Sequence, residues 1–131
     1  MVGSMLPMLA VEDVKGTLEF YNEKLGFEVG TVSPSRENPV FADVSKFGAT
    51  LEFERLENIN SGFRENERFD PKAKRGVGVV FYIIVGTDID RYYEELRRKG
   101  VKILQEIADR PWGARTFAIE DINGYRLCFR T

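Results

Sequence analysis

The chain has 131 residues, of which 43% are hydrophobic and 31% charged, and its formal net charge is −2. This length supports one well-buried core or two small fused modules, and the small net charge gives no field to attract nucleic acid or an anionic membrane. The single cysteine excludes an internal disulfide, and the lack of histidine removes a common metal ligand and general base. The apolar runs are too short to span a bilayer, so we expect a cytoplasmic protein.

The first half of the chain predicts a strand, a helix and three more strands. Asp13 is the expected N-cap of the helix, and Gly26 lies near its C-terminal end. Apolar residues recur at helical spacing between them, and strict alternation marks the strands that follow. The predicted elements are a strand at 5–11, a helix at 13–25 and strands at 27–32, 40–45 and 49–56.

The second half of the chain repeats the first. Phe41-Ala42 precedes Gly48 by the same spacing as Phe117-Ala118 precedes Gly124, and the residues that follow also match. A second helical stretch opens at Asp88. Two copies of a strand-helix-strand-strand-strand unit fit this length. We predict one domain over residues 5–131, with a first module at about 5–57, an exposed linker loop at 58–74 and a second module at about 75–131.

Alternation within the last strand of each module predicts which face is buried. Leu51 and Phe53 share the face that packs under the helices, whereas Glu52 and Glu54 point away from it. The second module behaves alike, with Arg126, Cys128 and Arg130 opposite the buried Leu127 and Phe129. A sheet with helices on one side leaves a polar face that is either solvated or curled into a cleft.

The order of several short motifs resembles the vicinal oxygen chelate superfamily, which includes glyoxalase I, extradiol dioxygenases, fosfomycin-resistance enzymes and bleomycin-resistance proteins. The motifs are Val11-Glu12-Asp13-Val14, Phe20-Tyr21, Leu25-Gly26-Phe27, Pro111-Trp112-Gly113-Ala114-Arg115, Phe117-Ala118 and Asp121-Ile122-Asn123-Gly124. The resemblance implies an α+β fold of two tandem βαβββ modules. It further implies a cup-shaped mixed sheet with helices on its outer face, a homodimer, and a ligand in the cup.

Metal enzymes of that superfamily place four ligands on the cup-facing strands. Carried over by position, these places hold Leu6, Glu52, Val80 or Phe81, and Cys128. The superfamily uses His, Gln or Glu there, and only Glu52 is of that type. A divalent ion needs three or four convergent donors. We therefore expect no metal and no other cofactor.

Several side chains are candidate ligand-binding residues. Glu52 and Glu54 supply carboxylates, although glutamates on an alternating strand are often merely solvated. Trp112 occupies a turn where an indole lines a cleft wall or serves only in packing. Arg126 and Arg115 are candidates for binding an anion, with solvated surface as the alternative.

Cys128 and Leu6 are further candidate ligand-binding residues, because they occupy two of the positions carried over from the superfamily. A thiol needs a nearby cation or helix N-terminus to become a nucleophile, so we do not expect Cys128 to be catalytic, and no catalytic residue is assigned. Asp121 and Asn123 are expected to shape the turn before Gly124.

Two functions of different classes remain open. The first is a metal-independent protein that sequesters a small organic ligand, aromatic or cationic, as the bleomycin-resistance type does. The second is a lyase, isomerase or dioxygenase that holds a metal against a vicinal-oxygen substrate. The lack of histidine favours binding over catalysis. A third, a dimeric scaffold whose cleft has become a packed interface, is also compatible. We expect neither nucleic acid nor membrane as a partner.

Overall fold

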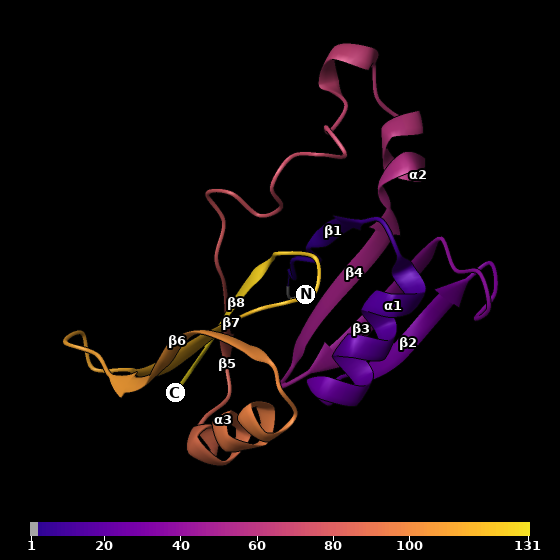
Figure 1. Cartoon of the computed structure of the whole chain (residues 1–131). Coiled ribbons are helices and arrows are strands. Elements are labelled where there is room, and N and C mark those ends of the chain that lie inside the picture. The colour runs from indigo at the N-terminus through magenta and orange to yellow at the C-terminus, as the bar shows by residue number, and fades with distance from the viewer. Residues whose placement is uncertain (1–2) are drawn as a thin grey trace. The chain divides into compact units, whose positions relative to one another are not determined.

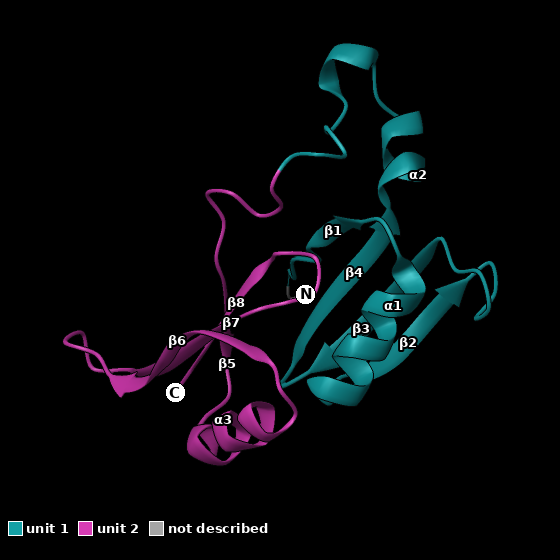
Figure 2. Cartoon of the chain, viewed as in Figure 1, with its two compact units in different colours: residues 1–73 teal, residues 74–131 magenta. Residues whose placement is uncertain are grey.

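The structure is a computed structural model that describes residues 3–131 (Figure 1), and the chain forms two compact units (Figure 2). Unit 1 extends to Ala73, and unit 2 runs from Lys74 to Thr131. Each unit contains one four-stranded mixed sheet with a helix packed on it. The α+β class and the two tandem modules predicted from the sequence are therefore confirmed.

Unit 1 has the strand order β1-β4-β3-β2, in which β1 is parallel to β4 and the other pairs are antiparallel. A helix, α1, packs against β3 and β4 (Figure 1). The elements are β1 (Met8–Val11), α1 (Val14–Glu19), the π-helical turn η1 (Phe20–Lys24), β2 (Glu28–Ser33), β3 (Phe41–Lys46), β4 (Ala49–Arg55), α2 (Leu56–Ser61) and the 3-10 turn η2 (Glu65–Glu67).

The predicted helix begins at its expected cap and ends in a π-helical turn. The Asp13 carboxylate accepts a hydrogen bond from the Gly16 backbone N–H at 3.1 Å, which satisfies one of the donors left open at a helix start. In the last turn, the Leu25 N–H donates to the Phe20 carbonyl at 3.3 Å. This wider turn lets Tyr21 and Leu25 both reach the core, where each is fully buried.

The first strand is shorter than the predicted 5–11, because regular pairing with β4 starts at Met8. Pro7 has no N–H to give to the ladder, although its carbonyl accepts from the Glu52 N–H at 2.9 Å. Met5 and Leu6 precede the strand and are exposed.

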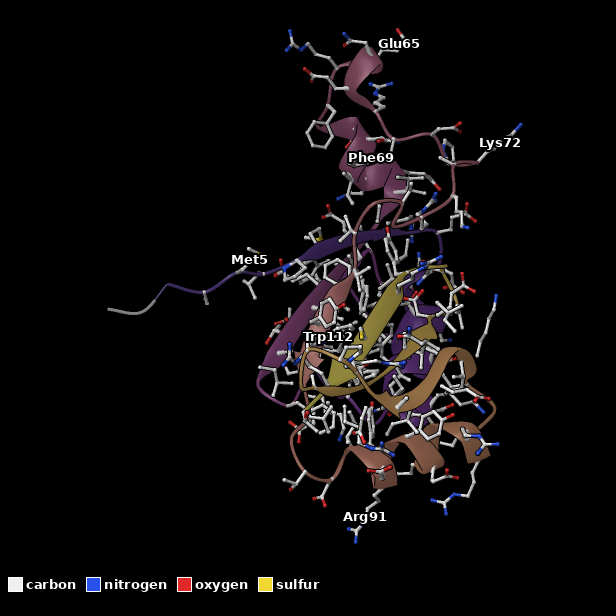
Figure 3. The ribbon with its side chains drawn as sticks, turned by 90° about the vertical axis from the view of Figure 1, so that its left-hand side faces the viewer. Met5, Glu65, Phe69, Lys72, Arg91 and Trp112 are labelled. Carbon is white, nitrogen blue, oxygen red and sulfur yellow. The ribbon has the colours of Figure 1, made fainter. Side chains whose placement is uncertain are left out.

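The predicted linker loop at 58–74 is more ordered than expected. It begins inside α2, which follows β4 without a break. The Asn60 side chain bonds both the N–H and the carbonyl of Phe69, each at 2.9 Å, and Phe63 meets Phe69 edge-on with ring centroids 6.0 Å apart. Figure 3 shows Phe69 and Glu65 in this segment. Hydrogen bonds from local side chains hold this segment in a folded conformation, and composition alone does not reveal them.

Unit 2 has the strand order β5-β8-β7-β6, with β5 parallel to β8. Its helix packs against β6 and β7. The elements are β5 (Phe81–Ile84), α3 (Ile89–Arg98), β6 (Lys102–Asp109), β7 (Arg115–Glu120) and β8 (Arg126–Arg130). Within residues 3–131, no helix has both the length and the apolar character needed to cross a membrane.

Each core lies between a sheet and its helix, on the faces that alternation predicts. In unit 1, Leu51 and Phe53 are buried, and in unit 2, Leu127 and Phe129 are fully buried. The Phe129 ring lies 5.1 Å from both Tyr92 of α3 and Phe117 of β7. Such aromatic clusters contribute both buried area and favourable edge contacts.

The two modules differ by one residue in the register of their last strand pair. If Phe53 and Phe129 are equivalent, Phe41 should match Phe117, yet Phe41 lies opposite Glu54 whereas Phe117 lies opposite Phe129. A shift of one residue sends a side chain to the other face of the sheet. Phe117 is therefore fully buried, while Phe41 is half-buried on the open face of unit 1.

The turn that connects the two paired strands also differs in length between the modules. Lys46 pairs with Ala49 across the two residues 47–48, whereas Glu120 pairs with Arg126 across residues 121–125. Hairpin register depends on turn length and type. The sequence repeat is therefore not a strict repeat of buried and open positions.

Truncating Phe129 should destabilise the protein strongly, because its ring is buried and touches two other rings. We expect Phe129→Ala to lower the free energy of unfolding by roughly 3–5 kcal/mol. Ile122→Ala, at an exposed position, should change it by less than about 0.5 kcal/mol. Urea denaturation followed by circular dichroism measures both, and equal losses would contradict the assigned core.

Candidate functional site

The open face of the unit 1 sheet carries two of the predicted ligand-binding residues side by side. Glu52 and Glu54 lie two positions apart on β4 and are both half-buried. The neighbouring β3 places Asp43 opposite Glu52 and Phe41 opposite Glu54, and directly opposed residues share one face. On the other side, Met8 of β1 pairs with Glu52. The face therefore combines three carboxylates with an aromatic ring and a thioether.

The three carboxylates differ in what holds them. Asp43 accepts a hydrogen bond from the Thr31 N–H of β2 at 3.3 Å, next to Gly30, where any Cβ would collide with this carboxylate. Glu54 accepts from the Asn58 side-chain amide at 3.0 Å. Among residues 3–131, the structure gives the Glu52 carboxylate no hydrogen-bond or ion-pair partner. Glu52 is thus the carboxylate of this face that is available to a ligand.

Leu6 lies near this face but outside the strand. It is 54% exposed and precedes the first paired residue of β1 by two positions. Its hydrocarbon side chain offers contact area and no donor atom for a metal.

The open face of unit 2 carries Arg126 and Cys128 on β8. Cys128 lies opposite Tyr82 of β5 and Ala118 of β7, and these neighbours leave it only 4% exposed. Burial raises the pKa of the Cys128 thiol, while the charge of Arg110 and hydrogen bonds with Thr116 and Tyr82 act in the opposite direction. Cys128 points away from α3, as predicted, yet it is covered rather than exposed.

Arg115 faces α3 and is bound by two carboxylates of its own unit. Its guanidinium donates to the Asp90 carboxylate at 2.7 and 3.1 Å and lies 3.3 Å from the Asp109 carboxylate. The hydrogen bond to Asp90 raises the pKa of Arg115, and the same bond lowers the pKa of Asp90. Two carboxylates of its own unit therefore bind Arg115, and the anion-binding role considered for it stays a prediction.

Trp112 occupies the turn between β6 and β7 and is 63% exposed (Figure 3). The Gly113 N–H closes this turn by donating to the Arg110 carbonyl at 3.0 Å. Along β7, the turn adjoins Arg115, whereas Arg126 pairs with Glu120 at the opposite end of that strand. Unit 2 therefore does not bring Trp112 and Arg126 together.

Unit 2 contains a cavity of about 380 Å³ beside Arg126. Lys74 and Arg75 also line it, at the end of the predicted linker loop and at the start of the predicted second module. Sequence-based reasoning also missed Phe41 and Asp43 of the unit 1 face. The alternation of β3 is visible in the sequence and puts Phe41 and Asp43 on one face. The sequence does not show the pairing register, which decides that this face is the open one.

The positions where the superfamily holds a metal do not supply a donor set in this chain. Glu52 is the one carboxylate among them, Leu6 and either Val80 or Phe81 are hydrocarbon, and the thiol of Cys128 is buried with a raised pKa. Over residues 3–131, no group of three or more His, Cys, Asp or Glu side chains is placed to hold a metal ion. The residues present do not fit a metal centre.

The chain is therefore a protein of two tandem βαβββ modules, in which each sheet carries a helix on one face. The chain belongs to the Glyoxalase/Bleomycin resistance protein/Dioxygenase superfamily, whose model matches residues 5–129. The resemblance seen in the sequence motifs is thereby confirmed. Comparison with curated proteins gives no match.

Solved structures show the same fold at low sequence identity. TioX from Micromonospora sp. ML1 is 21% identical, with a TM-score of 0.74 over 98% of each chain. A glyoxalase/bleomycin resistance protein/dioxygenase from Nocardioides is 22% identical, with a TM-score of 0.75 over 99% of this chain and 85% of its own. A superfamily member from Sphaerobacter thermophilus DSM 20745 is 21% identical, with a TM-score of 0.72 over 99% and 97%. At such identities, the likeness establishes the fold alone.

Cys128 should react slowly with alkylating reagents in the native protein. Its side chain is buried and its pKa is raised, so little thiolate exists or is reachable at pH 7. We expect iodoacetamide to modify the native chain at least about tenfold more slowly than the urea-unfolded chain. Mass spectrometry of timed samples measures both rates. Equal rates would show that the thiol is reactive in the folded state.

Proposed function

We propose that this protein binds a small organic molecule and that it does so without a metal ion. The observation that carries the proposal is Glu52, a half-buried carboxylate on the open face of the unit 1 sheet with no side-chain partner among residues 3–131. A carboxylate shielded from water interacts more strongly with an opposite charge than a fully exposed one does. Such a group is suited to hold a ligand cation.

The neighbours of Glu52 favour a cationic or aromatic ligand. Glu54 and Asp43 add negative charge to the same face, and Phe41 supplies a ring next to Glu54. A cation gains from both a carboxylate and the face of an aromatic ring. A phosphate-rich ligand would meet only repulsion here. The ligand class is therefore an amine or quaternary ammonium compound with an aromatic part.

The residues at the superfamily's metal positions support sequestration over metal-dependent chemistry. Among these residues, only Glu52 is of a type that coordinates metal in that superfamily. A single carboxylate is not enough to bind a divalent ion. The alternative function, a metal-dependent lyase, isomerase or dioxygenase, would need donors that these positions lack.

Glu52→Gln should weaken binding of an aromatic ammonium compound, because the substitution removes the charge and keeps the shape. With benzyltrimethylammonium as the probe, we expect a loss of about tenfold, or roughly 1.4 kcal/mol. Glu23→Gln, at an exposed site in η1, is the matched control and should stay within about twofold. Isothermal titration calorimetry measures all three proteins, and Trp112→Phe tests whether the exposed indole contributes.

The same preparations decide the metal question. Protein purified without added metal should carry far less than one equivalent of Zn, Ni, Fe or Mn, and a chelator should leave its melting temperature unchanged. Stoichiometric metal would overturn the metal-free proposal. No binding of the probe, or equal affinities for Glu52→Gln and Glu23→Gln, would overturn the assignment of the face.

We also propose that the protein is an isologous homodimer. The edge strands β1 and β5 keep apolar side chains exposed, with Met8 at 41%, Tyr82 at 57% and Ile84 at 67%. A second copy of the chain would cover this apolar surface. If both copies use the same patch, the interface is symmetric and the assembly stops at a dimer. We expect sedimentation at micromolar concentration to give twice the chain mass of 15.0 kDa. A species of single chain mass would contradict the dimer.

A further inference from the structure

The open face of unit 1 changes its chemistry in regular steps along its two central strands. Three pairs of directly opposed residues lie on it, namely Phe41 with Glu54, Asp43 with Glu52, and Ser45 with Thr50. All six side chains are half-buried. Successive pairs are two residues apart, which corresponds to about 6.7 Å along a strand. A molecule that lies along the strands therefore passes from an aromatic ring to a pair of carboxylates and then to hydroxyls.

The two carboxylates of the middle pair are turned apart. β3 lies between β2 and β4 (Figure 1). The Asp43 carboxylate leans over β2, where it accepts the Thr31 N–H at 3.3 Å and occupies the space that a side chain at Gly30 would fill. Glu52 belongs to β4, on the other side of β3. Like charges that are directly opposite repel one another, and this placement keeps the two carboxylates apart.

A primary ammonium group is suited to bridge this pair. It has three N–H donors, so it can donate to both carboxylates at once. Within residues 3–131, neither Asp43 nor Glu52 forms an ion pair, and the bond that Asp43 accepts comes from an uncharged backbone N–H. A hydrogen bond between charged groups is stronger than one between neutral groups. The middle pair therefore favours an ammonium with several N–H donors.

The apolar part of such a ligand has a preferred direction along the strands. Toward the hairpin turn, the hydroxyls of Ser45 and Thr50 bond one another at 2.9 Å, and this pair favours polar groups. In the other direction, the Phe41 ring lies one pair away, beside Glu54, whose carboxylate accepts from the Asn58 amide at 3.0 Å. Aromatic rings gain free energy by packing edge-on or offset against one another. The ring of a ligand is therefore expected on Phe41.

We propose that the ligand is a primary arylalkylamine whose ammonium group bridges Asp43 and Glu52 while its ring packs on Phe41. This inference rests on the proposed function, and it assigns Phe41 as the residue that selects the length of the ligand. The ring and the nitrogen must then span about 6.7 Å along the strands. An extended chain of three carbons does so, because ordinary single bonds place the nitrogen roughly 6–7 Å from the ring centre.

Met8 is the competing apolar contact, and it predicts a different length. It pairs with Glu52 across β1 and β4 and is 41% exposed. Neighbouring strands are only about 4.8 Å apart, so a ring on Met8 would favour a chain of one carbon. The length of the chain therefore distinguishes Phe41 from Met8.

The test is calorimetric titration of the whole protein with benzylamine, 3-phenylpropylamine and 5-phenylpentylamine, which carry one, three and five carbons between ring and nitrogen. We expect the three-carbon amine to bind at least about fivefold more tightly than benzylamine, and the five-carbon amine to gain nothing further. Burial of apolar area alone would instead raise the affinity with every added carbon. Asp43→Asn should weaken binding of the three-carbon amine about fivefold, because it removes one of the two charges.

Phe41→Ala should abolish the preference for three carbons over one, because the ring is lost while both carboxylates stay. Phe20→Ala is the matched control. Phe20 is also half-buried, but it packs on Tyr21, which contacts Phe53 on the opposite face of the sheet, so the preference should persist. Circular dichroism and urea denaturation establish that the variants fold, and the wild-type series decides the chain length without them.

The outcomes separate this inference from the function on which it rests. If none of the amines binds, both are overturned. The inference alone is overturned if the amines bind and Glu52→Gln weakens them, but benzylamine binds most tightly or the affinity rises with every added carbon. The same holds if Phe41→Ala and Phe20→Ala keep the preference equally well.

Discussion

The pairing register of the two inner hairpins determines which side chains reach the open face of each sheet. β3 pairs with β4 across a two-residue turn, and β7 pairs with β8 across residues 121–125. The period of a strand is two residues, so a register change of one exchanges the buried and open sets. Phe41 and Asp43 are on the open face of unit 1 for this reason, next to Glu54 and Glu52.

The buried faces of the two units are alike, while their open faces differ in charge. Both cores consist of rings and branched aliphatic side chains between one helix and one sheet. The open face of unit 1 is acidic around Glu52, whereas the cavity of unit 2 is lined by Lys74, Arg75 and Arg126. Core residues must satisfy packing and tolerate little change, but open faces are free to diverge. The two modules thus keep one architecture while their open faces carry different charges.

Two charged groups of unit 2 bind other parts of their own unit. Arg115 holds Asp90 of α3 and Asp109 of β6, and Asp121 holds the loop before β8. Asp121 is 5% exposed, and a polar side chain that is so buried requires such partners. Glu52 differs from them, because the structure gives its carboxylate no hydrogen-bond or ion-pair partner among residues 3–131.

The sequence alone determined the fold class, the repeat, the cap at Asp13 and the faces of β4 and β8, because these follow from local spacing and from the two-residue period of a strand. It also placed Glu52 and Glu54 together, since both belong to one strand. It could not separate Trp112 from Arg126, foresee the order within residues 58–73, or assign Lys74 and Arg75 to a cavity. Those outcomes depend on turn lengths, side-chain bonds and loop contacts between residues distant in the chain. Only the tertiary structure fixes which distant residues meet, because register and loop packing are set by contacts that no local pattern encodes.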